Sequence, residues 1–313
     1  MNKVSCRKAF TKTLAHIAQQ NGSIFMICSD SMGSSTATNF FKKFPDRFIE
    51  VGIAEQNAVG IAAGLASVGK TVFVAGPSSF LTARSYEQIK IDVAYNQTNV
   101  KIIGVSAGVS YGPLGGTHTT LHDFAGLRAL PNIEIFAPSD AVQTAFITKY
   151  LAVQKGPAYM RLGRGDVDAV YPITENFEIH KAKILCGADT ADVAIIACGE
   201  MVCPALQAAE LLAAHGIAAR IIDMFCLKPA DVTAICKASI ETRAIVTVEE
   251  HSIFGGLGEL VCSTVAQFGR PVPIRIMGFP DEEYKVGKNT ELFGYYKLTA
   301  PDIADAARKL VRA

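Results

Sequence analysis

The chain has 313 residues, of which 50% are hydrophobic and 19% are charged, and its formal net charge at pH 7 is +1. This length provides for about two domains, and this composition is typical of a folded protein with large buried sheets, which excludes a disordered chain. The balanced charge gives no reason to expect a nucleic-acid or membrane-surface partner, and no apolar run reaches the ~20 residues that a membrane-spanning helix needs.

The first half of the chain alternates short apolar runs with helical patterns. Residues 1–22 have the pattern of an amphipathic helix with Phe10, Leu14 and Ile17 on one side, and they lack the apolar core and cleavage site of a signal peptide. Strands are predicted at 24–28, 48–51, 71–75, 100–106, 133–137 and 158–162, and helices at 54–68, 80–95, 120–130 and 140–154. Strands that are apolar on both faces and separated by helices predict a parallel sheet covered on both sides.

The alternation lapses between about residues 163 and 187 and then resumes. Further strands are predicted at 193–199, 218–224, 244–250 and 272–278. We therefore predict an α/β fold with two doubly wound, parallel-type sheet domains, at residues 1–165 and 189–313, joined by a linker at 166–188. The chain has eight cysteines without a C-x-x-C pair or a zinc spacing, so we expect a reduced, cytoplasmic protein with no metal site of its own.

Unusual residues follow the predicted strands of the first half. The stretch "SDSMGSS" follows the first strand, Glu55 the second, "GPSSF" the third and "AGVSYGPLGGTH" the fourth. Ligands of open parallel sheets gather at the loops beyond the carboxyl ends of the strands, so these loops are expected to form one pocket. Glu55 has a plainer interpretation as well, because a carboxylate is favoured in the first turn of a helix.

An ordered set of segments gives the chain a family resemblance. The segments "FPDRFIEVGIAEQNAVGIAAGLA", "SSFLTARSYEQIKIDVAY", "GGTH" and "LPNIEIFAPSDA" resemble the pyrimidine-binding domain of the transketolase group of thiamine diphosphate enzymes. The segment "VTVEEHSIFGGLGELV" resembles the start of the C-terminal domain in that group. The resemblance covers nearly the whole chain, and the best match is the C-terminal chain of a split, two-chain transketolase.

The resemblance implies residues that bind the cofactor. Glu55 corresponds to the catalytic carboxyl group that hydrogen-bonds the far nitrogen of the aminopyrimidine ring and favours its imino tautomer. Phe80 corresponds to an aromatic wall of the pyrimidine pocket, and Tyr86 is a second candidate for that wall, with core packing as its alternative. Asp30 is expected to face the cofactor or, alternatively, to cap a helix.

The resemblance also implies a substrate end of the site. His118 matches a catalytic histidine that faces the substrate, Arg164 matches an arginine that binds the substrate phosphate, and Ser34 is grouped with them. Relatives usually have a histidine in place of Ser106 and an aspartate in place of Leu114. A pocket that lacks both polar groups favours a changed substrate, such as a branched, deoxy or differently charged ketose.

The Gly-Asp-Gly signature with which these enzymes hold the diphosphate through a divalent metal is missing from this chain. The resemblance therefore implies an N-terminal transketolase subunit as partner, which binds Mg²⁺ or Ca²⁺ with the diphosphate, in a dimer of heterodimers. The expected activity is transfer of a two-carbon ketol unit between anionic sugars. The alternatives are the beta chain of a 2-oxoacid dehydrogenase complex, an enzyme like 1-deoxyxylulose-phosphate synthase, and a non-catalytic chain that has kept the fold.

Overall fold

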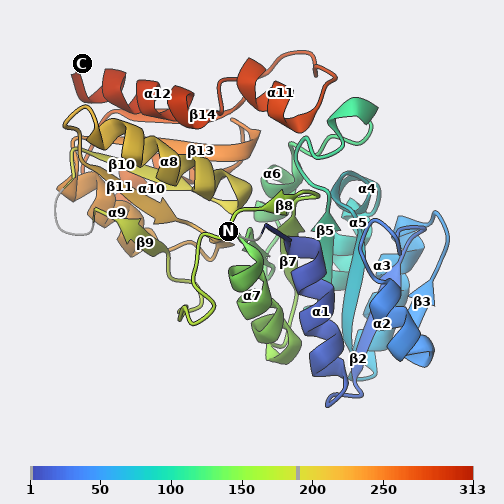
Figure 1. Ribbon diagram of the computed structural model, residues 1–313. Coiled ribbons are helices and arrows are strands. Elements are labelled where there is room, and N and C mark those ends of the chain that lie inside the picture. Colours follow the sequence, from blue (N-terminus) through green and yellow to red (C-terminus); the bar gives the residue numbers. More distant parts are fainter. Residues whose placement is uncertain (1–2, 188–190, 313) are drawn as a thin grey trace.

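The computed structural model describes residues 3–187 and 191–312, which form two α/β units, each with a sheet between layers of helices (Figure 1). The larger sheet has the strand order β12-β6-β7-β5-β4-β2-β3. Its strands from the first half of the chain are all parallel to one another. They are β2 (Ile24–Cys28), β3 (Phe48–Glu50), β4 (Thr71–Pro77), β5 (Val100–Val105), β6 (Glu134–Phe136) and β7 (Ala158–Leu162).

Helices cover both faces of this sheet, as the apolar pattern predicts. On one face, Phe73 of β4 packs in a core with residues of α1 (Cys6–Ala18), α2 (Thr38–Lys43) and α7 (Ala141–Val153). On the other face, Val72 and Val74 pack in a core with residues of α3 (Glu55–Ser67), α4 (Ser78–Arg84) and α6 (Asp123–Arg128). Alternate residues of one strand thus face opposite cores, which is why the central strands are apolar throughout.

The helix expected at 80–95 is broken in the structure. It consists of α4, the short α5 (Tyr86–Gln88) and a π-helical segment, Ile89–Tyr95. At the break, the Ser85 hydroxyl donates a 2.5 Å hydrogen bond to Leu81 O, and such back-bonding from serine often bends helices. The break separates Phe80 from the core residues Ile89 and Val93, so the two groups need not share one helical face.

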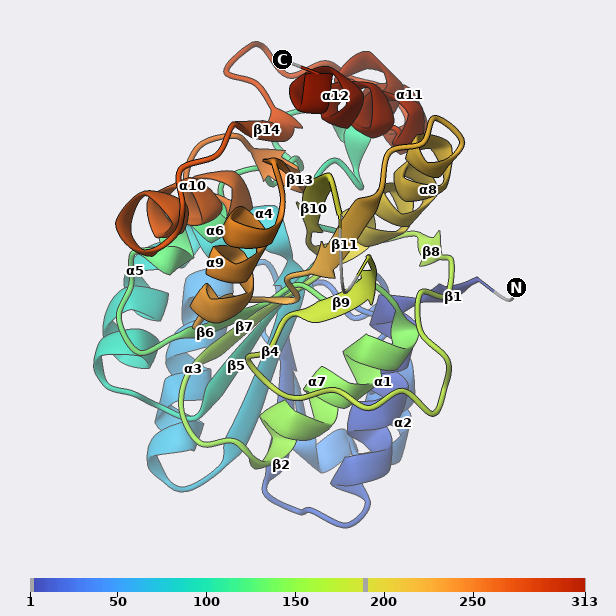
Figure 2. The same ribbon diagram turned by 90° about the vertical axis from the view of Figure 1, so that its left-hand side faces the viewer.

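The smaller sheet has the order β14-β13-β10-β11-β9, and its four strands from the predicted second domain are parallel. They are β10 (Val193–Ala197), β11 (Ala219–Asp223), β13 (Ala244–Ser252) and β14 (Ile274–Phe279). Two pairs of helices cover its faces: α8 (Val202–Ala213) with α12 (Ala300–Arg312), and α9 (Val232–Glu241) with α10 (Leu257–Phe268) (Figure 2). This confirms the predicted α/β class with two parallel-dominated sheets.

Strand pairing divides the predicted linker between the two halves of the chain and ties the second half to the first sheet. The segment predicted as a linker contributes β8 (Asp166–Val167), which pairs with β1 (Val4–Ser5), and β9 (Lys183–Cys186), which pairs antiparallel with β11. The strand β12 (Cys226–Lys228), from the second half, pairs antiparallel with β6 of the first sheet. Each of these strands satisfies backbone groups at a sheet edge, and β12 joins the two halves directly.

One core cluster is continuous across the domain boundary. It contains Phe124 and Ile133 of the first half together with Ile196, Leu227 and Leu257 of the second. Burial of this shared apolar surface holds the two domains in a fixed relation, which matters for the site below. Among the described helices, none has the length and hydropathy to cross a membrane.

Candidate active site

Glu55 begins helix α3 at the carboxyl edge of the first sheet and is 5% exposed. Ser29, which follows β2, fixes this helix start, because its hydroxyl donates to Gly52 O at 2.8 Å and accepts from Ala54 N–H at 3.0 Å. An ion pair of 3.1 Å joins Glu55 Oε1 to Arg84 Nη1. The carboxylate therefore has its charge balanced by a guanidinium that is about half exposed.

A continuous row of side chains leads away from this ion pair. The Arg84 guanidinium lies 4.0 Å from the centre of the Phe80 ring, and Phe80 meets His118 edge-on at 5.0 Å between ring centres. His118 meets Tyr111 edge-on at 5.5 Å, and the Tyr111 hydroxyl accepts a 2.8 Å hydrogen bond from Arg164. The structure thus brings together Glu55, Phe80, His118 and Arg164, which come from four different segments of the chain.

A second arginine stands beside Arg164 at the far end of the row. Arg7, in the first turn of α1, donates to the carbonyl oxygens of Ser34 and Arg164. Burial lowers the pKa of Arg7, and the neighbouring Arg164 charge lowers it further. Neither guanidinium forms an ion pair with a carboxylate among the described residues, so the two cations together suit an anionic group of a ligand.

Sequence reasoning missed Arg7, Arg84 and Tyr111. The sequence contained a signal for two of these residues, Arg7 and Arg84. A cation in the first turn of a helix opposes the helix dipole, so Arg7 calls for a reason other than helix stability. Arg84 lies four residues after Phe80 on one helix, and this spacing places the two side chains on the same face. Tyr111 carried no comparable signal, because its loop position does not determine its neighbours.

The other predicted site residues lie in different surroundings. The side chain of Ser34 donates to Ser31 O at 3.1 Å, so it is the carbonyl of Ser34 that faces Arg7. Ser106 is 1% exposed, and its hydroxyl has no hydrogen-bond partner among the described residues. Leu114 is 54% exposed at the tip of its loop. The sequence predicted a less polar substrate end at Ser106 and Leu114. The structure has a buried hydroxyl without a hydrogen-bond partner among the described residues at the first position and an exposed apolar side chain at the second.

Asp30 and Tyr86 stand apart from the row. Asp30 is exposed with a φ of 46°, and its backbone N–H donates to Glu50 Oε1 at 2.6 Å; it caps none of the described helices. Tyr86 packs against the larger core and donates its hydroxyl to Gly126 O at 3.1 Å. The contacts of Tyr86 match the packing alternative, and within the described part of the chain it makes no ring contact with Phe80.

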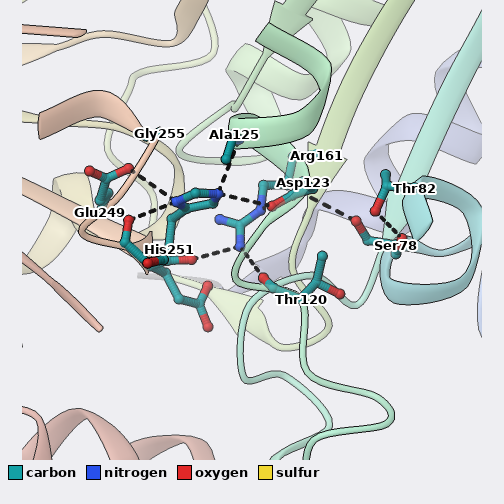
Figure 3. A network of polar contacts seen from close by, with 12 residues as sticks. Ser78, Thr82, Thr120, Asp123, Ala125, Arg161, Glu249, His251 and Gly255 are labelled. Atoms are coloured by element: carbon teal, nitrogen blue, oxygen red, sulfur yellow. Dashed lines mark hydrogen bonds and ion pairs between the residues drawn. The ribbon is translucent and has the colours of Figure 1, made fainter. Parts of the chain in front are cut away.

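A buried polar network joins the two domains (Figure 3). Asp123 Oδ2 accepts hydrogen bonds from Tyr159 at 2.6 Å and from Arg161 Nε at 2.9 Å. Burial acts to raise the pKa of Asp123, but the Arg161 charge and other partners outweigh it, so the pKa lies below its usual value. His251 is fully buried beside Asp123, and burial lowers its pKa to about 4, which leaves the imidazole neutral at pH 7. All contacts of Arg161 are internal, as expected of a structural residue.

Comparisons with known proteins identify the family of the chain. Residues 2–169 match the model of the transketolase pyrimidine-binding domain, and residues 180–303 match the model of the transketolase C-terminal domain. The chain is 49% identical over 311 residues to an apulose-4-phosphate transketolase subunit of Phocaeicola vulgatus, with 99% of each chain covered. It is 34% identical to a 6-deoxy-6-sulfo-D-fructose transketolase subunit of Clostridium sp., with 97% of this chain and 94% of that protein covered.

Solved structures give the same result. A split gene transketolase, described as an inactive beta4 tetramer, superposes with a TM-score of 0.89 at 37% identity, and 99% of each chain is covered. The transketolase of Campylobacter jejuni has the same fold, with a TM-score of 0.84 at 17% identity, and this chain covers 47% of its length. With both domain models matched in order over nearly its whole length, the chain belongs to the transketolase family.

Proposed function

We propose that this chain is the subunit of a transketolase-like enzyme that holds the pyrimidine end of thiamine diphosphate and transfers a two-carbon ketol unit between anionic sugars. The observation that carries the proposal is the single row from the buried Glu55, through Phe80 and His118, to Arg164 and to Arg7, whose guanidinium donates to Arg164 O. The row combines a buried carboxyl group, an aromatic wall, a polar group for a reacting oxygen and an anion site. Those are the parts that ketol transfer between sugar phosphates needs.

The cofactor end of the row fits an aminopyrimidine ring. When bound, thiamine diphosphate supplies a stabilised carbanion at its thiazolium ring, which is the chemistry that a protein lacks. Glu55 would hold a proton toward the far ring nitrogen from a site with little water, and Phe80 would offer its face to the ring. In this arrangement Arg84 must give up part of its contact with Glu55, because a carboxyl that delivers a proton cannot remain a paired carboxylate.

His118 is proposed to bind the reacting oxygen of the sugar. Its Nδ1 lies 2.9 Å from the Thr117 hydroxyl, which leaves Nε2 for the substrate. The edges of Phe80 and Tyr111 hold the imidazole from two sides. A histidine that is already oriented can hydrogen-bond to the developing charge without reorganisation, which is how such groups lower a barrier.

Arg7 and Arg164 are proposed to bind the anionic end of the sugar. Each guanidinium presents a fork of N–H donors that suits the oxygens of a phosphate group. The orphaned hydroxyl of Ser106 and the exposed Leu114 support a ketose other than the usual donor. The names of two relatives point the same way, since those proteins are named for apulose 4-phosphate and for 6-deoxy-6-sulfo-D-fructose.

The proposal includes a partner subunit with the diphosphate-binding domain and its Mg²⁺ or Ca²⁺, in a dimer of heterodimers. The described residues contain no cluster that could hold a metal ion. Ile53, two residues before Glu55, is 75% exposed, and Tyr95 is 71% exposed, which suits a surface that another chain covers. All eight cysteines are free, which supports a reducing, cytoplasmic location.

The test is ketol transfer by the chain reconstituted with its partner, with a panel of phosphorylated, branched and sulfonated ketose donors and a common aldehyde acceptor. We expect activity that depends on thiamine diphosphate and a divalent cation, and none from either chain alone. Oxidative decarboxylation of a 2-oxoacid without ketol transfer would instead support the 2-oxoacid dehydrogenase alternative. Condensation with loss of CO₂ from pyruvate would support the alternative that resembles 1-deoxyxylulose-phosphate synthase.

A further inference from the structure

The loop at residues 107–120 carries His118 between β5 and α6. Its base is closed by an antiparallel bridge in which Gly108 N–H donates to Thr120 O at 3.1 Å and Thr120 N–H donates to Gly108 O at 2.8 Å. A loop closed in this way moves as a unit about its base. The position of His118 therefore depends on whatever contacts hold the base and the tip of the loop.

The second domain holds the base. Glu250, on β13, accepts a 2.9 Å hydrogen bond from Val109 N–H through its Oε1 atom. Gly108 has a φ of +64°, and a Cβ atom there would lie 2.1 Å from the Glu250 carboxyl carbon, so only glycine permits this approach. Arg161 Nη2 donates to Thr120 O at 3.2 Å and to Glu250 O at 2.6 Å, which ties the other side of the base to the same strand (Figure 3).

The second domain also covers the tip. In Figure 1 the teal-to-green loop above α4 rises beside the segment that leads into α11 (Asn289–Tyr295). A Cβ on Gly112 would lie 2.2 Å from Gly287 O, and one on Gly116 would lie 3.1 Å from the Tyr284 ring. The loop thus lies against this segment so closely that a side chain at Gly112 would clash with its backbone.

We propose that Glu250 and Tyr284 are positioning residues: from the second domain they hold the loop 107–120 at its base and at its tip, and so place His118 toward the substrate. The proposal rests on the proposed function, because that function gives His118 its role. The physical reason is entropy. A glycine-rich loop has many conformations, and the contacts of His118 with Phe80 and Tyr111 require one of them. Small misplacement of a catalytic group is costly in rate.

The surroundings of Glu250 tell which substitution preserves its contact. Burial raises the pKa of Glu250 to about 8; the charge of Arg161 opposes this rise, and Glu200 and Asp123 add to it. Near neutral pH the side chain therefore spends much of its time as the neutral acid. Glutamine has the same shape and keeps an oxygen that can accept from Val109 N–H, whereas alanine removes the acceptor. A comparison of Glu250→Gln with Glu250→Ala therefore shows what is lost when the acceptor for Val109 N–H is removed.

Amide hydrogen exchange of the full chain, read by mass spectrometry, tests positioning without any need for activity. Loss of one hydrogen bond at the base in Glu250→Ala should speed exchange within 109–119 by about tenfold. Glu250→Gln should stay within about threefold of wild type. The matched control is Glu249→Gln, because Glu249 is buried on the same strand but accepts from Leu257 and Gly258 of its own domain. That control should affect α10 and leave 109–119 unchanged.

Tyr284→Ala tests the tip without endangering the fold, because Tyr284 is 46% exposed. It should speed exchange at 112–118, whereas Tyr295→Ala should not; Tyr295 is a 56% exposed tyrosine of α11 whose ring packs on Tyr296. If Glu250→Ala fails to fold, the Tyr284→Ala result decides. The proposal is overturned if the loop exchanges within twofold of wild type in Glu250→Ala and Tyr284→Ala, or in whichever of these two variants folds.

A kinetic arm links the positioning to the reaction. In the reconstituted pair, Glu250→Ala should lower kcat by about tenfold with a smaller change in KM, and Glu250→Gln should restore most of it. An unchanged kcat in Glu250→Ala despite faster loop exchange would overturn the link to His118. If the wild-type pair transfers no ketol unit, the proposed function fails, and the exchange result still decides whether the second domain positions the loop.

Discussion

Replacement of Arg7 by alanine gives the most direct test of the anion site. A hydrogen bond to a charged group contributes about 1.5–3 kcal/mol. At ~1.4 kcal/mol per factor of ten, Arg7→Ala should raise KM for a phosphorylated donor about 10- to 150-fold. Because the contact is made to a remote anion in both the bound substrate and the transition state, kcat should change much less.

The geometry also predicts how Arg7 and Arg164 combine. Arg7 donates to Arg164 O and to Ser34 O, so its removal loosens the backbone that carries the second guanidinium. The effects of Arg7→Ala and Arg164→Ala should therefore not add, and the double variant should lose less than the sum of the two single losses. The assay is kcat and KM for a ketose phosphate and for the same ketose without its phosphate, in all four combinations.

Lys8→Ala is the matched control, since Lys8 is the exposed neighbour of Arg7 on α1. It should leave both constants unchanged, and none of the arginine variants should affect the unphosphorylated ketose much. The reasoning is refuted if Arg7→Ala raises KM equally for both ketoses, because the loss would then come from disturbed structure. It is also refuted if the two arginine effects add fully.

Three further predictions concern other parts of the molecule. Glu55→Gln should leave assembly with the partner intact and lower kcat about 100-fold or more, since glutamine cannot deliver the proton; near-normal turnover at saturating cofactor would mean that another group does so. Ser106→His combined with Leu114→Asp should shift kcat/KM toward xylulose 5-phosphate, and a wild type that already prefers this donor would contradict the altered-substrate interpretation. Burial raises the pKa of Asp223 to about 7, despite hydrogen bonds from Tyr171 and two other side chains. A carboxyl group whose pKa is raised in the folded state adds most to stability below its unfolded-state pKa, near 4, and this contribution is lost as the pH rises through about 7. Asparagine does not titrate, so the urea midpoint of Asp223→Asn should rise relative to that of wild type when the pH is changed from 5 to 8.5. Equal differences at both pH values would exclude this assignment.

The sequence alone determined the layers of the fold and the sheet edge at which Glu55, Phe80 and His118 lie. Runs such as 71–75 and 100–106 are apolar at nearly every position, and only strands buried on both faces need that pattern. Their loops must then meet at one edge, which by itself predicts that Glu55, Phe80 and His118 lie near one another. These inferences succeeded because each depends on residues that are close in sequence or on a general rule of parallel sheets.

Tertiary structure alone decided which charges face one another and how the domains interlock. The contact between Arg7 and Arg164 joins residues 157 positions apart, and the hydrogen bond from Val109 to Glu250 joins residues 141 positions apart. The pairing of β12 with β6 of the first sheet depends likewise on which sheet edges come close after folding. A local sequence pattern predicts the face of an element on which a side chain lies. The residue that this side chain contacts depends on how whole domains pack, and that packing places the loop of His118 against the second domain.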